Sequence, residues 1–379
     1  MLESIREELM KFKTDRLMII VCLIFPICVN LIIGAELSKG VMDHIPMAVV
    51  DYDESQMSRQ LIQYFADNNS FDIKYYPEDQ KALEKLLDTS KARVGMVIPK
   101  DFSADATSLK SPTIMMLYDG SHMSMVSAAK SKATEILLTA RVGGSIKQLQ
   151  GRFNHSYNEA YTIAMPISFE ARTLYNPTKN FSYFMLPGYG TIVCQLGIGL
   201  TAILCRPYPR DEKKKRNALG HIIGKVLVYG IVGSMAIIIN LLVQACVFKI
   251  PCRGSIFIAY GLSILYMFAV AALSVALSVW FHNKVLGMAI GGLMLIPNSI
   301  MAGYTWPVLS MLPSYKWTSK FIPFTHYGES IRDLFLKGRM THINQDILYL
   351  EGFILVMIAI GTIGVCINRM RAPREEDQR

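Results

Sequence analysis

The chain has 379 residues, of which 51% are hydrophobic and only 18% are charged. Soluble domains usually carry about 25% charged residues, and the shortfall here is concentrated in long stretches without any charge. These properties exclude a soluble globular protein. The formal net charge of +9 does not predict nucleic-acid binding, because the chain lacks the long basic block of a DNA-binding tail.

Six stretches lack Asp, Glu, Lys and Arg over a length that meets or approaches the roughly 20 residues of a bilayer-spanning helix. They cover residues 17–35, 183–205, 226–248, 254–281, 285–315 and 352–368. Prolines divide the fifth stretch, so we expect its span to end near Gly303. Acidic residues precede the first stretch and no small-residue cleavage site follows it, so we expect a retained anchor.

The layout predicts an α-helical polytopic membrane protein with six transmembrane helices and an inserted extracytoplasmic α/β domain. We expect the spans at residues 17–35, 183–205, 221–248, 254–281, 285–303 and 346–368. The remaining segments are an amphipathic helix at 1–16, the inserted domain at 36–182, an inner loop at 206–220, an outer re-entrant or helical element at 304–345 and a tail at 369–379. The first of these segments has apolar residues at helical spacing and should lie along the inner membrane surface. A simple extension of the first span is the alternative.

Basic residues predict the orientation. With both termini in the cytoplasm, the inner segments hold about twice as many Lys and Arg residues as the short outer segments, as the positive-inside rule requires. This places residues 36–182 outside. All seven cysteines lie elsewhere, nearly all in or beside predicted spans, and no C-x-x-C pair occurs. We therefore expect no disulfide in the inserted domain and neither a zinc nor a redox site.

The inserted domain reads as alternating strands and helices, which favours a mixed sheet with helices packed on it. We predict strands at residues 47–50, 71–76, 94–98, 113–118 and 167–175. The predicted helices are one at 56–66, one opened by Pro77 and a long one at 123–149. Asp51 and Asp53 follow the first strand, and such carboxylates far more often form turns than hold a cation.

The chain shows no catalytic constellation. Gly220 to Lys225 has three residues between its glycines, whereas a phosphate loop needs four, and Val226 stands where Ser or Thr would bind magnesium. We therefore expect no ATP site, no catalytic residue, no metal and no cofactor in this chain. The glycines more plausibly serve helix packing.

Two polar segments border the spans. The inner loop from Arg206 to Arg216 is strongly basic, so it fixes orientation and is also a candidate docking surface for a cytoplasmic partner. On the outer side, Glu329, Arg332 and Asp333 fall within one helical turn and can pair at spacings of three and four. A short helix at the outer mouth of a pathway would accommodate them, and an ordinary surface helix is the alternative.

Four segments in order along the chain resemble the ABC-2 type permeases, which share the type V exporter fold, and in particular the bacterial inner-membrane permeases of drug or lipid efflux. They are AVVDYDESQMSR at 48–59, VGMVIPKDF at 94–102, LYNPTKNFSYFMLPG at 174–188 and the closing element at 323–338. Each segment alone is weak, but the ordered set covers nearly the whole chain.

The resemblance implies a permease that expels a hydrophobic or amphipathic substrate, using ATP bound by separate cytoplasmic ABC ATPase subunits. It also implies a second permease subunit, identical or paralogous, contact with membrane lipid and scope for a periplasmic adaptor protein. ATPase coupling would fall on Arg210, Asp211, Glu212, Lys213 and Asn217, and the outer gate on Pro323, His326, Glu329 and Arg332. The family's usual R-E-R-E-x-G-T run is absent after the second span, so the details of coupling differ. A non-transporting membrane receptor or assembly factor, with the inserted domain as its ligand domain, is the alternative function.

Overall fold

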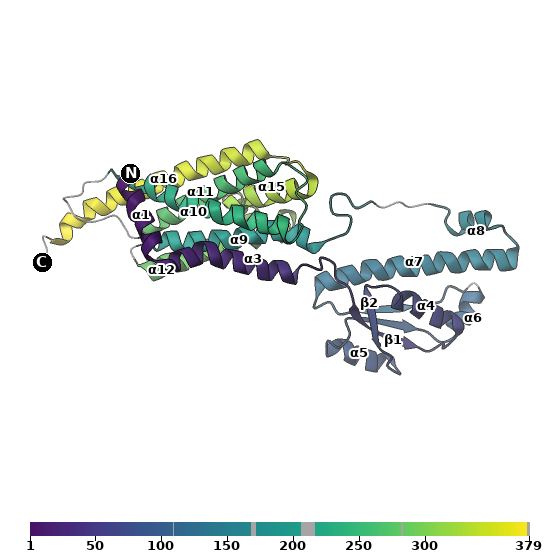
Figure 1. Cartoon of the computed structure of the whole chain (residues 1–379). Helices are drawn as coiled ribbons and strands as arrows, with labels where there is room; N and C mark the ends of the chain where they lie inside the picture. The colour runs from purple at the N-terminus through teal and green to yellow at the C-terminus, as the bar shows by residue number, and fades with distance from the viewer. Residues whose placement is uncertain (109, 168–171, 206–216, 282, 377–379) are drawn as a thin grey trace. The chain divides into compact units, whose positions relative to one another are not determined.

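A computed structural model describes residues 1–108, 110–167, 172–205, 217–281 and 283–376. The chain forms two compact units, one made of Met1–Gly40 with Thr173–Arg379 and the other of Val41–Arg172. Figure 1 shows a helical bundle for the first and a small sheet with helices for the second.

The first unit contains six helices that are long and apolar enough to cross a membrane, at Arg16–Glu36, Phe181–Ile203, Ala218–Cys246, Ile256–Trp280, Lys284–Met301 and Ile343–Met370. A turn of π-helix, η1 (Ile20–Ile24), joins α2 (Arg16–Ile19) and α3 (Phe25–Glu36) in the first. The others are α9 (Phe181–Ile203), α10 (Ala218–Cys246), α11 (Ile256–Trp280), α12 (Lys284–Leu295) with α13 (Asn298–Met301), and α16 (Ile343–Glu376). They overlap the charge-free stretches predicted as spans, and their ends differ from the predicted ones by a few residues at several places. Helix α12 already ends at Leu295, before Pro297.

Helices α9 and α11 are the most buried of the six, whereas α3, α12 and α16 each leave an apolar flank uncovered. Leu293 on α12 and Leu355 on α16, for example, are 74% and 69% exposed. A water-soluble bundle would bury such side chains. These flanks are therefore suited to lipid or to a second apolar protein surface, and the chain is a multi-pass membrane protein.

Short helices complete this unit. Helix α1 (Leu2–Thr14) corresponds to the predicted amphipathic helix, and residues 304–345 hold η3 (Val308–Ser310), α14 (Pro313–Ser319) and α15 (Pro323–Lys337). Pro323 opens α15, where its missing N–H is not needed, and Gly338 ends the helix with a positive φ of 78°. The outer element of the prediction is therefore a series of helices, and α15 is the longest of them.

The second unit is built on a four-stranded sheet in the order β2-β1-β3-β4. Its strands are β1 (Ile45–Asp51), β2 (Phe71–Tyr75), β3 (Val94–Ile98) and β4 (Met115–Tyr118). Strands β2 and β3 pair with β1 in parallel, and β4 pairs with β3 antiparallel. The mixed sheet is thus confirmed. The further strand predicted at 167–175 is not formed at 172–175, and residues 168–171 lie outside the described part of the chain.

Helices cover both faces of this sheet. Helix α4 (Gln56–Ala66) and the first half of α7 (Met123–Phe153) pack on one face, and α5 (Gln80–Asp88) packs on the other. Two shorter helices, α6 (Phe102–Thr107) and α8 (Tyr157–Ala164), follow β3 and α7. Because central strands are covered on both sides, β1 and β3 read as near-continuous apolar runs.

Two local predictions can be judged in atomic detail. The helix expected to open at Pro77 begins instead at Gln80, because the Asp79 side chain accepts the Ala82 N–H at 2.7 Å and caps it. Asp51 forms the expected turn: its carboxylate accepts the N–H groups of Asp53 and Glu54, each at 3.1 Å. Its second oxygen accepts the Ser58 hydroxyl at 2.6 Å.

Candidate functional site

Arg332 lies on α15 and faces two aromatic rings. Its guanidinium carbon is 4.7 Å from the ring centroids of both Phe184 and Tyr304, and its Nη1 donates to the Tyr304 carbonyl at 2.9 Å. The predicted pair with Glu329 is wrong for the described residues, because Glu329 points to the exposed side of the helix. Stacking and a carbonyl acceptor satisfy the arginine instead.

Tyr304 joins this arrangement to α9, at the point where Pro187 interrupts that helix. Its hydroxyl accepts the Gly188 N–H at 2.9 Å and donates to the Phe184 carbonyl at 2.7 Å. In an uninterrupted α-helix these two backbone groups would bond to each other. The tyrosine is therefore inserted into the hydrogen-bond ladder of α9, an arrangement that is a known source of helix bends.

His326 is held at the start of α15 by groups from two other segments. Its Nδ1 lies 3.1 Å from Asp346 of α16, its Nε2 lies 3.0 Å from the Lys320 carbonyl, and its ring stacks on Tyr349 at 3.8 Å between centroids. Ser330 also donates to the buried Asp346 carboxylate. The structure thus places Pro323, His326 and Arg332 on one helix that is fixed to α9 and α16.

The residues proposed for the inner side are mostly outside the described part of the chain. Arg210, Asp211, Glu212 and Lys213 all fall within the undescribed residues 206–216. Asn217 is described, and its side chain caps α10 by accepting the Leu219 N–H at 3.1 Å. That contact gives Asn217 a structural role at the start of α10, and its role in coupling stays a prediction.

A cluster of buried amide side chains lies inside the bundle, and the absence of charges in the spans gives no sign of it. Asn240 on α10 donates to the Gly190 carbonyl at 3.0 Å, and Gln244 donates to the Leu186 carbonyl at 2.9 Å. The Nε2 atom of Gln244 also donates to Oδ1 of Asn30 on α3 at 3.4 Å. Amides spaced four residues apart in an apolar helix are the signal that could have revealed it, since polar groups in membranes need internal partners.

An open groove of about 660 Å³ runs between α9 and α12. Every residue that lines it is apolar: Leu200, Met288, Ala289, Gly292, Leu293, Ile296 and Pro297. Gly292 adds no side chain there, and a Cβ at this position would meet only Ile296 at an ordinary 3.6 Å. The groove can accept a hydrophobic molecule and offers no polar group that would select a particular one.

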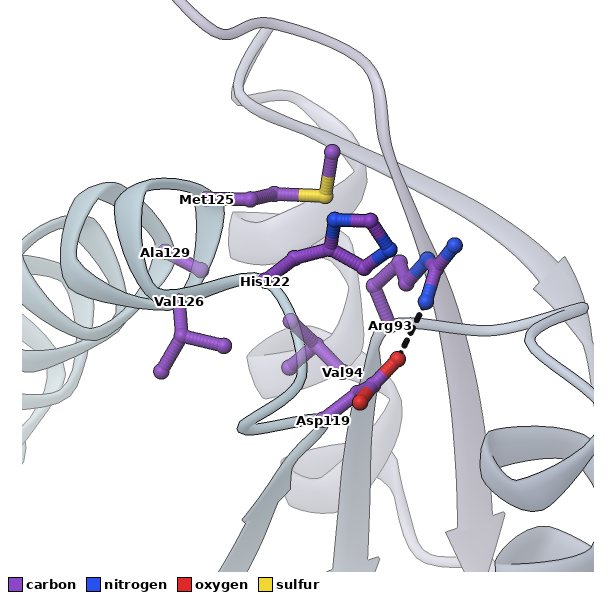
Figure 2. A pocket seen from close by; sticks show the side chains of 7 residues that line it. All are labelled: Arg93, Val94, Asp119, His122, Met125, Val126 and Ala129. Atoms are coloured by element: carbon purple, nitrogen blue, oxygen red, sulfur yellow. Dashed lines mark hydrogen bonds and ion pairs between the residues drawn. The ribbon is translucent and has the colours of Figure 1, made fainter. Parts of the chain in front are cut away.

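The second unit has a small hollow between β3 and the start of α7 (Figure 2). Arg93 and Asp119 pair there beside His122, but the side chains leave essentially no room for a water-sized molecule. Hydrogen bonds from Ser121 and then from Arg93 lower the pKa of Asp119 to about 2. We interpret the pair of Arg93 and Asp119 as a structural ion pair that fills this hollow. Within the described residues, no cluster of His, Cys, Asp and Glu could hold a metal.

Comparison with known proteins agrees with this architecture. The sequence model of the ABC-2 family transporter proteins matches residues 16–363. The probable multidrug ABC transporter permease YbhR of Escherichia coli K12 is 20% identical over 337 residues, which cover 86% of this chain and 87% of YbhR. The probable multidrug ABC transporter permease YbhS of the same strain is 22% identical over 303 residues, covering 76% of this chain and 75% of YbhS.

A third relative, the inner membrane transport permease YhhJ of Escherichia coli K12, is 19% identical over 348 residues, covering 88% of this chain and 87% of YhhJ. No solved structure matches the chain. The family match spans the bundle and the second unit alike, and the relatives are permeases aligned over most of their length. The chain therefore belongs to the ABC-2 family of transporter proteins, as a transmembrane permease of an ABC exporter.

Proposed function

We propose that this permease moves hydrophobic or amphipathic molecules, such as drugs or lipids, outward across a bacterial inner membrane. The observation that carries the substrate class is the groove between α9 and α12, which is lined by apolar side chains alone. A molecule that partitions into the bilayer can enter such a groove from the side without losing contact with an apolar environment. The names of YbhR and YbhS as probable multidrug permeases support the same class.

In this proposal, ATP hydrolysis by a partner protein supplies the energy for export. The chain contains no phosphate loop, so ATP is bound by separate cytoplasmic ABC ATPase subunits, which dock on the inner surface that includes residues 206–220. A second permease subunit, identical or paralogous, completes the pathway. The uncovered apolar flanks of α3 and α16 are suited to that contact as well as to lipid. A periplasmic adaptor protein could meet the second unit on the outer side.

The orientation of the chain follows from its basic residues. We propose cytoplasmic termini and an extracytoplasmic second unit, because the inner segments carry about twice as many Lys and Arg residues as the short outer segments. A cysteine at the exposed Ser124 on α7 should react with an impermeant thiol reagent in intact cells, after native Cys252 has been replaced. The same cysteine in a strain with permeabilised membranes is the positive control. Labelling that requires permeabilisation would reverse the proposed orientation.

Filling the groove tests the substrate path. The Gly292→Phe variant should reduce export of a lipophilic dye about tenfold or more, since a ring would occupy the space that the dye needs. ATPase subunits should still co-purify with it in mild detergent. Gly352→Phe is the matched control, because Gly352 on α16 also faces open space but lies outside the groove.

Two results would contradict the proposal. Equal dye export by both glycine variants would remove the groove from the pathway. The second result has two parts: the wild-type chain purifies without any ATPase, and deletion of its gene leaves dye export unchanged. Together they would favour a receptor or assembly factor over a permease.

A further inference from the structure

Lys225 is a fully buried cation in a membrane helix. It lies on α10 and is only 2% exposed, and it is one of the largest fully buried side chains in the described residues. A charge at this depth is costly unless it is paired, and such residues usually mark a functional element. Its carboxylate partner is Glu8 of α1, also 2% exposed, with Nζ and Oε1 3.8 Å apart.

Glu8 joins three groups at once. It accepts from the Lys11 ammonium at 2.6 Å and from the Tyr229 hydroxyl at 3.1 Å, in addition to its contact with Lys225. Two cations and a hydroxyl thus compensate one buried carboxylate, which is what a desolvated charge needs to be tolerated. The neighbouring Glu7 is exposed, so burial singles out one carboxylate of α1.

Helix α1 lies directly against α10 around this cluster. The hydroxyl of Ser4 is 2.9 Å from Nδ1 of His221, and the ring of Phe12 meets Tyr229 edge-on at 5.6 Å. Gly224 permits the approach: a Cβ built there would be 3.1 Å from the Ser4 Cβ. A helix that merely floated on the membrane surface would keep its carboxylates in water.

The cluster also reaches the segment that follows α9. Lys225 Nζ lies 3.3 Å from the Cys205 sulfur, and Cys205 in turn lies 3.3 Å from the Ser278 hydroxyl of α11. Cys205 immediately precedes residues 206–216, which carry the proposed ATPase-docking loop. Lys225 of α10 therefore contacts α1 through Glu8 and the residue that leads into that loop, and Cys205 in turn connects it to α11.

We propose that Glu8 and Lys225 are positioning residues that hold α1, α10 and Cys205 as one body, and that this body transmits the movement of the ATPase to the membrane helices. The inference rests on the proposed function. Apolar residues could pack the same helices at least as stably, but apolar contact does not fix the register of a surface helix. The buried carboxylate of Glu8 does, because a shift of α1 along α10 would break its contacts with Lys225 and Tyr229 together.

The first experiment separates transmission from folding. The permease is purified with its ATPase in lipid nanodiscs, and ATP turnover is measured beside hydrogen–deuterium exchange of residues 304–337 with and without nucleotide. Glu8→Gln should lower the yield of folded protein most, because it takes one buried carboxylate from Lys11, Tyr229 and Lys225 at once. Lys225→Gln should lower the yield less, because Glu8 keeps its contacts with Lys11 and Tyr229. The double variant should recover yield and ATP turnover, yet its nucleotide-dependent exchange at 304–337 should fall about tenfold or more. Lys13→Gln, which neutralises an exposed cation on the same helix, is the matched control and should behave as wild type.

The second experiment replaces the charge pair by a covalent bond. Cysteines at Ser4 and Gly224 need only a small relaxation to reach disulfide geometry, given the 3.1 Å between their Cβ positions. Formed in the Glu8→Gln, Lys225→Gln background, this disulfide should restore the exchange response to within about twofold of wild type, and reduction should remove it again. Each single cysteine is the control for unwanted pairing.

The outcomes distinguish the two proposals. A wild-type chain that binds no ATPase overturns the proposed function and this inference with it. Three results overturn the inference alone. The first is a wild-type complex that turns over ATP without any exchange response at 304–337, and the second is an unimpaired double variant. The third is a disulfide that abolishes the exchange response in an otherwise wild-type chain. The last result would mean that α1 and α10 must separate during the cycle.

Discussion

Replacing Gly190 by valine is expected to abolish the folded permease. A Cβ at this position on α9 would lie 2.2 Å from the Gln244 amide nitrogen, 2.7 Å from the Asn240 amide oxygen and 3.0 Å from that of Asn30. The side chain would overpack the helix contact and also break the hydrogen bonds of the buried amides. Overpacking alone costs about 1–3 kcal/mol, and each stranded amide adds about 1–3 kcal/mol.

The measurement is the yield of monodisperse protein after size-exclusion chromatography in mild detergent. Gly261→Val provides the control, because Gly261 on α11 has open space where the Cβ would be, and this variant should keep most of its yield. A normal yield of the Gly190→Val protein would show that the amide group is not needed to assemble the bundle.

Changing Arg332 to methionine should lower export about tenfold or more while folded protein can still be recovered. The guanidinium stacks on two rings and donates to a carbonyl, and a desolvated cation–π contact is worth about 2 kcal/mol. Arg332→Lys should be almost as damaging, because an ammonium cannot reproduce the planar stacking. Dye export per ATP hydrolysed is the measurement.

Glu329→Gln is the companion variant for this test. Glu329 is exposed on the same helix and makes no ion pair with Arg332 in the described structure, so its loss should change export little. The double variant should then match Arg332→Met alone. A double variant that exports better than Arg332→Met would show that the two side chains are coupled after all.

Much of the fold could be predicted because its signals are local. Charge-free stretches predicted the six membrane helices. The apolar run at 94–98 and the alternating segment at 71–76 predicted β3 and β2 to within a residue. The start of α5 was misplaced because two local signals competed. Pro77 is a good first helical residue, but Asp79 provides a capping carboxylate, and the cap decided where the helix begins.

The site was less predictable because its contacts join distant parts of the chain. Spacing alone suggested Glu329 as the partner of Arg332, whereas the rings that receive the arginine come from positions 184 and 304. Nothing in the sequence near Tyr304 shows that its hydroxyl will be used by α9. Glu8 and Lys225 are more than two hundred residues apart in the chain, so neither neighbourhood reveals the other.

The hydroxyl of Tyr304 within α9 has a mechanical consequence. Because it binds the Gly188 N–H and the Phe184 carbonyl, a side chain from another segment helps to hold the turn around Pro187. Withdrawing the tyrosine would leave the Gly188 amide and the Phe184 carbonyl to each other, while Pro187 still offers no N–H to the Tyr183 carbonyl. The stiffness of α9 at this turn is therefore set from outside the helix, by whatever moves residue 304.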